Sequence, residues 1–480
     1  MKRALRWLGA ALAVVVAVLV ARGMTATSRQ ITAPQADSLS AFELDAACER
    51  LSAVVRLRTV TDSGGGAFAE LHDMLADRLP GVRALERRDF PLGALYTWKG
   101  SDPTLPPALF LAHADVVPVE APQTWTHPPF GGVRADGLIW GRGALDDKAS
   151  LMALLEAASA LRSEGFTPRR TLMFAFGHDE ETRGQGARQI AAYLAEQGVR
   201  AALVIDEGGV IADGLVPGAP GPVALVGIAE KDAINVRLTA RDVGGHGSMP
   251  PPHTAAGRVG RAVALLEANP FPLRITPAAA AFMDWLAPEL PFGARLVLRN
   301  RWLFGSLVRA RYGATPKTAA QMRTTTAVTM LSGGPKANVL PKQATATINF
   351  RLLPGATHEQ VLARARQVIG DPQVEVELIE SVSAERAFVT DPDGPAFATV
   401  QRAIARVFPE VITVPFLVVA MTDARHYAAV SDQILRFAPL RLTAGDTDRI
   451  HGTDERISEA DYGAMVRFYA QLMRGLQDAS

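Results

Sequence analysis

Carboxylate and imidazole side chains follow three apolar segments of this chain. Each segment has the length and composition of a buried β-strand. Because the carboxyl ends of parallel strands meet at one edge of an open α/β sheet, we expect the side chains that follow them to converge there. The segments are 108–112, followed by His113 and Asp115; 171–176, followed by Glu180 and Glu181; and 202–205, followed by Asp206 and Glu207.

Several carboxylates at one sheet edge would repel one another strongly without a cation. Histidine and carboxylate ligands suit zinc best, with cobalt and manganese as alternatives, and the single cysteine, Cys48, excludes a multi-cysteine zinc site. Asp146 lies in a glycine-containing loop that enters a helix, from which it can reach the same edge as a bridging ligand. Alternation along the strand places Asp115 on the face of His113, where it can orient the imidazole.

Composition limits the class of partner. The chain has 480 residues, of which 48% are hydrophobic, and its formal net charge is +1. No basic run follows the first segment, so nucleic acid is not expected as a partner. A small molecule or short peptide fits better as the substrate.

The N-terminus has the pattern of a targeting segment. Lys2, Arg3 and Arg6 precede an apolar stretch that ends at Arg22. Residues 1–23 are therefore interpreted as a signal peptide or a membrane anchor, and the protein as exported, either secreted or anchored facing the exterior. A buried N-terminal helix is the alternative. Residues 24–40 are polar and irregular and are interpreted as a linker.

The remaining pattern predicts two units. Residues 41–231 and 384–480 alternate apolar strands with helices such as 150–162, which predicts an α/β catalytic domain with a largely parallel sheet. Residues 232–383 follow the order β-α-β-β-α-β, which predicts an inserted ferredoxin-like α+β domain. An apolar stretch at 271–312 within the insertion, predicted to be helical, is interpreted as an acyl or side-chain pocket, or as a dimer or membrane-facing surface.

Over nearly the whole chain after the linker, the sequence resembles the metallopeptidases that include aminoacylase, carboxypeptidase S, acetylornithine deacetylase and succinyl-diaminopimelate desuccinylase. The likeness is strongest to carboxypeptidase S and the secreted N-fatty-acyl-amino-acid hydrolase/synthase subgroup. The matching motifs are LAHADVVPV (111–119), W-x-H-P-P-F (125–130), GRGALDDK (141–148), DEE (179–181), DEGG (206–209), GGHGSMP (244–250), ANVLPKQATATINFRLLPG (337–355) and the late His451.

The resemblance implies a role for each matching residue. His113 and His451 would each bind one of two divalent metal ions, Asp146 would bridge the ions, and the peptide bond after Asp146 is often cis in relatives. Glu181 would bind one ion and Asp206 or Glu207 the other, with a slight preference for Asp206. Glu180 would be the general base.

Three further residues enter through the resemblance. His246 would stabilise the oxyanion, often across a dimer formed through the inserted domain. Arg351 and Arg425 are candidates to hold a substrate carboxylate through a bidentate fork. His178 and His127 are not ligand positions in the family, so structural roles are expected for them.

The expected function is metal-dependent hydrolysis of an amide bond next to a free carboxylate, as in a carboxypeptidase or an N-acyl amino acid hydrolase. The alternatives are a dipeptidase or aminopeptidase of the same family and an inactive membrane-anchored binding homologue.

Overall fold

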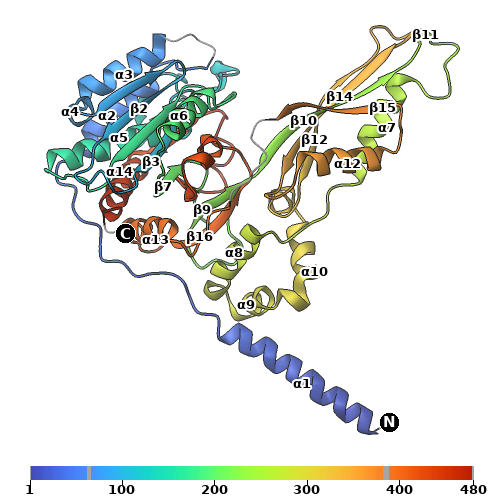
Figure 1. Cartoon of the computed structure of the whole chain (residues 1–480), viewed down its shortest axis with the longest axis horizontal. Coiled ribbons are helices and arrows are strands. Elements are labelled where there is room, and N and C mark those ends of the chain that lie inside the picture. Colours follow the sequence, from blue (N-terminus) through green and yellow to red (C-terminus); the bar gives the residue numbers. More distant parts are fainter. Residues whose placement is uncertain (1, 62–65, 382–388, 478–480) are drawn as a thin grey trace.

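The computed structural model describes residues 2–61, 66–381 and 389–477. It contains a large unit built on a mixed sheet, a smaller unit inserted into it, and an N-terminal helix that extends away from both (Figure 1). The boundary predicted at 383–384 falls outside the described residues.

The core of the large unit is a group of parallel strands. Neighbours pair in the order β6-β3-β7-β17, and β3 pairs in parallel with both β6 and β7. Their bounds are β3 (Ala108–His113), β6 (Leu172–Gly177), β7 (Leu203–Asp206) and β17 (Ile434–Arg436). These strands match the predicted apolar runs.

The sheet is mixed, which limits the prediction of a largely parallel sheet. Antiparallel pairs join β1 to β2, β2 to β6, β8 to β9 and β17 to β9, whereas β16 pairs in parallel with β9 and β18 pairs in parallel with β8. Short connections such as the one between β1 and β2 permit only antiparallel pairing, whereas a parallel neighbour needs a long crossover. The outer strands are β1 (Glu86–Phe90), β2 (Gly93–Trp98), β8 (Ile211–Ala212), β9 (Val223–Glu230), β16 (Ile412–Val418) and β18 (Arg441–Leu442).

Helices cover both faces of this sheet, which explains why its central strands are apolar without alternation. Phe110 and Phe174 stack within the core on one face, whereas Leu109 and Ala175 pack with the helix on the other. The first face carries α2 (Leu44–Val55), α5 (Lys148–Ser163), α13 (Pro395–Val407) and α14 (Glu459–Gly475); the second carries α6 (Gln185–Glu196).

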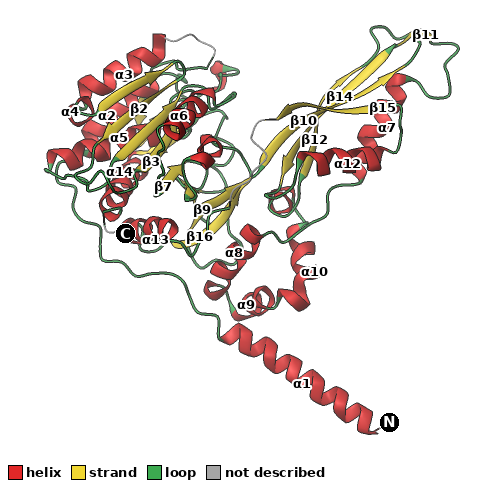
Figure 2. Cartoon of the chain, viewed as in Figure 1, coloured by secondary structure: helices red, strands yellow, loops and turns green. Residues whose placement is uncertain are grey.

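The inserted unit is a four-stranded antiparallel sheet with the order β12-β14-β10-β15 and two helices against it (Figure 2). Along the chain its main elements have the expected β-α-β-β-α-β order. Buried and more exposed residues alternate along β14, as in a sheet with one covered face. These elements are β10 (Asp232–Arg241), α7 (Ala255–Ala268), β12 (Thr325–Ser332), β14 (Gln343–Leu352), α12 (His358–Ile369) and β15 (Val374–Ser381).

The apolar stretch 271–312 is helical, as expected. Its first helix, α8 (Pro277–Leu286), packs on β16 through Phe282 and Phe416, whose ring centroids are 6.0 Å apart. The next two helices, α9 (Phe292–Arg299) and α10 (Arg301–Tyr312), lie farther out and carry exposed apolar side chains.

The N-terminal helix α1 (Lys2–Met24) is long and apolar enough to cross a membrane, with a mean hydropathy of 2.3 over its most apolar stretch. The segment that follows contains no helix or strand between Thr25 and Ser38, but it is attached to the large unit. Gln30 exchanges two hydrogen bonds with the backbone of Thr413, and Ala36 N donates to Arg406 O. The segment predicted as a linker therefore has no regular secondary structure but is hydrogen-bonded to the surface of the large unit.

Candidate metal centre

The predicted ligands come from four strand or helix ends and one late loop, and they meet at the carboxyl edge of the central strands. The structure brings them together in two groups. In each group, one ligand atom of every residue lies within 4.8 Å of the others. The groups are His113, Asp146 and Glu207, and Asp146, Glu181 and His451.

Asp146 belongs to both groups, and each of its carboxylate oxygens faces a different imidazole. Its Oδ1 lies 2.9 Å from His113 Nε2, and its Oδ2 lies 3.2 Å from His451 Nε2. His451 Nε2 also lies 3.0 Å from Glu181 Oε2. This is the arrangement of a bridging carboxylate, and the peptide bond after Asp146 is cis.

Glu207, rather than Asp206, has its carboxylate among the candidate ligands. The Asp206 carboxylate accepts hydrogen bonds from the backbone N–H of Ala424 at 2.7 Å and of Glu207 at 3.0 Å. Asp206 thus joins the end of β7 to the 3₁₀ helix η3 (Asp423–Ala429). Asp206 belongs to neither candidate group, and the preference for it as the ligand stays a prediction.

Asp115 is buried and arranges the backbone of the neighbouring acids. Its carboxylate accepts the backbone N–H groups of Glu180 and Glu181, both at 3.1 Å, and the Thr61 hydroxyl at 2.8 Å. His113 Nδ1 lies 3.4 Å from Asp115 Oδ1 and closer, 3.0 Å, to Asp115 O. Asp115 therefore positions both the imidazole and the Glu180–Glu181 pair.

The electrostatics of the site favour a bound cation. Burial, with the carboxylates of Asp146 and Asp147, raises the pKa of Glu207 well above its usual range. Burial also raises the pKa of Glu180 to about 7, against the opposing effects of His113 and Arg425. Buried carboxylates with raised pKa values bind positive charge favourably, and imidazole with carboxylate is a donor set that divalent ions accept. The residues present therefore fit a metal centre.

Two arginines approach Glu180 from different units. Arg425 Nη1, in η3, lies 3.6 Å from Glu180 Oε1 and is 2.6 Å from Thr422 O, to which it donates. Arg351 comes from β14 of the inserted unit, where burial and the nearby Arg425 guanidinium lower its pKa. The two predicted carboxylate-binding residues thus lie near each other and near Glu180.

The other histidines lie apart from the ligand groups. His246 is exposed in β11 (Gly245–His246), at the far end of the inserted unit, and its Nδ1 lies 2.7 Å from Ser248 Oγ (Figure 1). His178 Nε2 lies 2.8 Å from His72 Nε2, and its ring stacks on Phe68. His127 packs edge-on against Trp140.

Glu455 was not identified from the sequence, yet it organises the ligand loops. It is fully buried, and its Oε1 accepts the backbone N–H groups of Leu145 at 2.7 Å and Asp146 at 3.1 Å. Its Oε2 pairs with Arg142 at 2.6 Å, and Arg142 Nη2 donates to His451 O at 3.0 Å. The only feature of the sequence that could have drawn attention to Glu455 is that it lies four residues after the predicted ligand His451.

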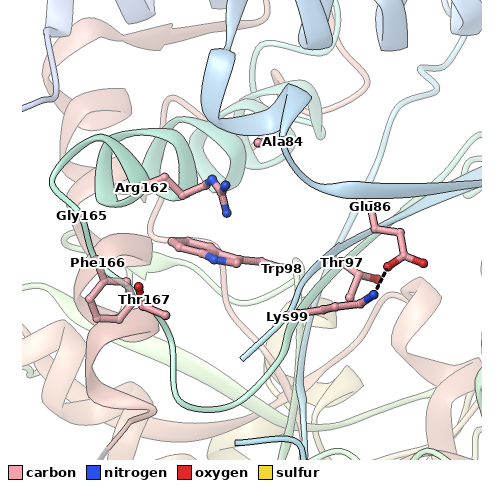
Figure 3. A pocket seen from close by; sticks show the side chains of 9 residues that line it. All are labelled: Ala84, Glu86, Thr97, Trp98, Lys99, Arg162, Gly165, Phe166 and Thr167. Carbon is pink, nitrogen blue, oxygen red and sulfur yellow. Dashed lines mark ion pairs between the residues drawn. The ribbon is translucent and has the colours of Figure 1, made fainter. Parts of the chain in front are cut away.

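A cavity of about 530 Å³ lies away from this centre, between β2 and the end of α5 (Figure 3). The Arg162 guanidinium carbon lies 5.2 Å from the centre of the Trp98 ring, and Lys99 pairs with Glu86 at 2.7 Å. None of the predicted site residues lines it.

Comparison with known proteins agrees with the resemblance. A model of peptidase family M20/M25/M40 matches residues 109–475. A probable carboxypeptidase S-like protein of Dictyostelium discoideum is 36% identical over 92% of this chain and 86% of its own length. The N-fatty-acyl-amino acid synthase/hydrolase of Homo sapiens is 39% identical over 79% of this chain and 76% of its own.

Solved structures show the same fold. An M20 family metallo-carboxypeptidase from Sulfolobus solfataricus has a TM-score of 0.65 at 16% identity, covering 89% of this chain and 98% of its own. The chain therefore belongs to peptidase family M20/M25/M40 and is an enzyme that acts on carbon–nitrogen bonds.

Proposed function

We propose that the enzyme hydrolyses an amide bond next to a free carboxylate, in an N-acyl amino acid or at the C-terminal end of a peptide. The position of Glu180 carries this proposal. Its carboxylate belongs to neither ligand group and lies beside Arg425. The backbone N–H of Glu180 donates to the Asp115 carboxylate, which fixes the position of this residue. A base next to the metal positions, with a guanidinium next to the base, is what this reaction requires.

In this proposal, His113, Asp146 and Glu207 hold one divalent ion, and Asp146, Glu181 and His451 hold a second. Zinc suits this ligand set best, with cobalt or manganese as alternatives. When bound, such ions activate water for attack and polarise the scissile carbonyl. Glu180 accepts the proton of the attacking water and delivers it to the leaving amine.

Arg351 and Arg425 bind the substrate carboxylate. The side chain of Arg425 is buried and Arg351 is half-buried, and the nearby Arg425 guanidinium helps to lower the pKa of Arg351. A substrate carboxylate between the two guanidiniums would offset this repulsion. They come from different units of the chain, so a substrate held by both would lie at the junction of the units. Bidentate geometry would fix the amide relative to Glu180.

The relatives support this substrate class over the alternatives. Proteins named as carboxypeptidase S and as N-fatty-acyl-amino acid synthase/hydrolase act, by those names, on compounds with a free carboxylate. A dipeptidase is the second candidate; a human carnosine dipeptidase has this fold with a TM-score of 0.62, at 17% identity. An inactive binding homologue is disfavoured, because Glu180 and all the ligand positions are present.

Two further elements belong to the proposal. A homodimer formed through the inserted unit would bring the exposed His246 of one copy to the metal centre of the other, where it stabilises the oxyanion. Export places the enzyme outside the cytoplasm, with α1 either removed as a signal peptide or retained as an anchor.

A substrate panel tests the reaction. Metal-loaded full-length enzyme should hydrolyse N-acyl amino acids, and the matching N-acyl amino acid amides should show kcat/KM lower by ~10²-fold, because a charge-assisted hydrogen bond to a buried arginine is lost. Initial rates followed by chromatography provide the measurement. Faster turnover of free dipeptides than of N-acyl amino acids would establish the dipeptidase alternative.

The substitution Glu180→Ala tests whether Glu180 acts as the general base rather than as a metal ligand. Its kcat should fall by about 10²–10⁴-fold because proton transfer is lost, while two metal ions per chain are retained. Metal content and kcat are measured on the same sample. Glu196→Ala, at an exposed position of α6, is the matched control and should leave both unchanged. Unchanged kcat in Glu180→Ala would refute the proposed mechanism.

Glu455→Gln tests the support of the ligand loop. Replacing the carboxylate weakens its pairing with Arg142 and its hold on the Asp146 backbone, so metal affinity should fall by about 10–100-fold. Competition with a chelator measures the affinity. Glu410→Gln removes an exposed partner of Arg441 and serves as the control. Equal affinity in both variants would show that Glu455 does not position the ligands.

Complementation tests the role of His246. Glu180→Ala and His246→Ala should each have low activity, and coexpression should restore activity in mixed dimers, because one composite site then has both side chains. Glu180→Ala coexpressed with Glu181→Ala should stay inactive, since both changes affect the same centre. If the first pair also fails to regain activity, His246 does not act across a dimer.

A further inference from the structure

The C-terminal turn of α1 is docked onto the helical insertion. Gly23 is buried against α9, where an added Cβ would lie 3.3 Å from Phe292 Cε2 and 3.5 Å from Leu296 Cα. The fully buried Asn300 donates through Nδ2 to Leu19 O at 3.0 Å and to Leu296 O at 2.8 Å. Figure 1 shows α1 leaving the body beside α9. The end of α1 is thus held by side-chain and backbone contacts.

The rest of α1 exposes apolar side chains to water. Leu12 is 65% exposed and Val14 is 63% exposed, and most of the helix touches nothing else in the chain. The whole helix, including its docked last turn, has 23 residues and is about 34 Å long, and it has the length and composition of a membrane span. A bilayer would remove this apolar surface from water, and the docked turn would then lie at its boundary.

The surface beside this docked turn is also apolar. Trp302, Leu303 and Leu307 are exposed on α10, and Phe292 is exposed on α9. Trp302 Nε1 donates to Asn300 Oδ1 at 3.2 Å, so the same asparagine joins α1 and this surface. Arg309 and Arg311 follow in the last turn of α10. Exposed tryptophan and leucine with arginine at the edge is typical of helices that lie in a membrane interface.

We propose that α9 and α10 form a membrane-seated platform beside a retained α1, with the side chains of Phe292, Trp302, Leu303 and Leu307 in the boundary between lipid headgroups and acyl chains. A bilayer, rather than a second protein, is the partner because the platform is continuous with a membrane-length helix docked on it. Two adjacent contacts with the bilayer would fix the orientation of the enzyme, which a single helix on a free tether would not.

The exposure of α10 also helps to choose between the two interpretations of the stretch 271–312, a substrate pocket or an outward-facing surface. Trp302 is 59% exposed and Leu307 is 56% exposed, so these side chains form surface rather than the wall of an enclosed acyl pocket. The proposal is independent of the reaction, since it concerns only how this face of the chain is covered.

Nitroxide labels report the environment of the platform directly. Leu303→Cys and Leu307→Cys are labelled in full-length protein reconstituted into vesicles of phosphatidylcholine and phosphatidylglycerol; Cys48 is fully buried and does not react. Glu70→Cys, exposed on α3 (Gly66–Arg78) of the large unit, is the matched control. The ratio of label accessibility to oxygen over that to a water-soluble nickel complex should be several-fold higher at 303 and 307 than at 70, because oxygen partitions into lipid.

Two results would overturn the proposal. A ratio at 303 and 307 equal to that at 70 would show that the platform lies in water. Low accessibility to both relaxants, with spin–spin broadening between labelled copies, would show that another copy of the chain covers it instead. Because both positions are exposed, failure of one variant to fold leaves the other as the test.

Discussion

The crowding of buried carboxylates at one sheet edge is the constraint on which the rest of this structure depends. Asp146 lies in one candidate ligand group with Glu207 and in the other with Glu181, and the carboxylate of Glu180 interacts electrostatically with those of Asp146, Glu181 and Glu207. Burial raises the pKa values of Glu180 and Glu207, and repulsion from the neighbouring carboxylates raises them further. Such an arrangement is stable only if positive charge is supplied, and divalent ions supply more of it in less space than the two imidazoles can.

The hydrogen bonds of the acidic residues divide them into two groups, those that hold the backbone of the loops and those that face the candidate metal positions. Asp115, Asp206 and Glu455 each accept backbone N–H groups, which fixes the loops that carry the ligands. Asp146, Glu181 and Glu207 instead face imidazoles or one another, and their oxygens are available to a cation. Asp115, Asp206 and Glu455 therefore hold the backbone that positions the candidate ligands.

The two units contribute different parts of the proposed substrate site. The large unit provides the metal ligands, Glu180 and Arg425, and the inserted unit provides Arg351. His246 lies too far along the inserted unit to be placed at the centre by its own chain in this arrangement (Figure 1). Elsewhere in the insertion, α9 packs against the end of α1, and in the proposal made above this region would meet a membrane.

The sequence by itself determined the strands β3, β6 and β7, the helix α5, and the main element order of the inserted unit, because burial on one or both faces leaves a regular apolar pattern. Its motifs also identified His113, Asp146, Glu181 and His451, which the structure brings together. The antiparallel pairing at the edges was not predicted, because β2 pairs with β6 and β17 with β9 across long stretches of chain that leave no local signal. Only the tertiary structure showed that Glu207 lies in a candidate ligand group while Asp206 accepts backbone N–H groups, and only it revealed Glu455 and Asn300. The physical reason is that adjacent acids look alike in a sequence, and contacts between residues hundreds of positions apart leave no local signal.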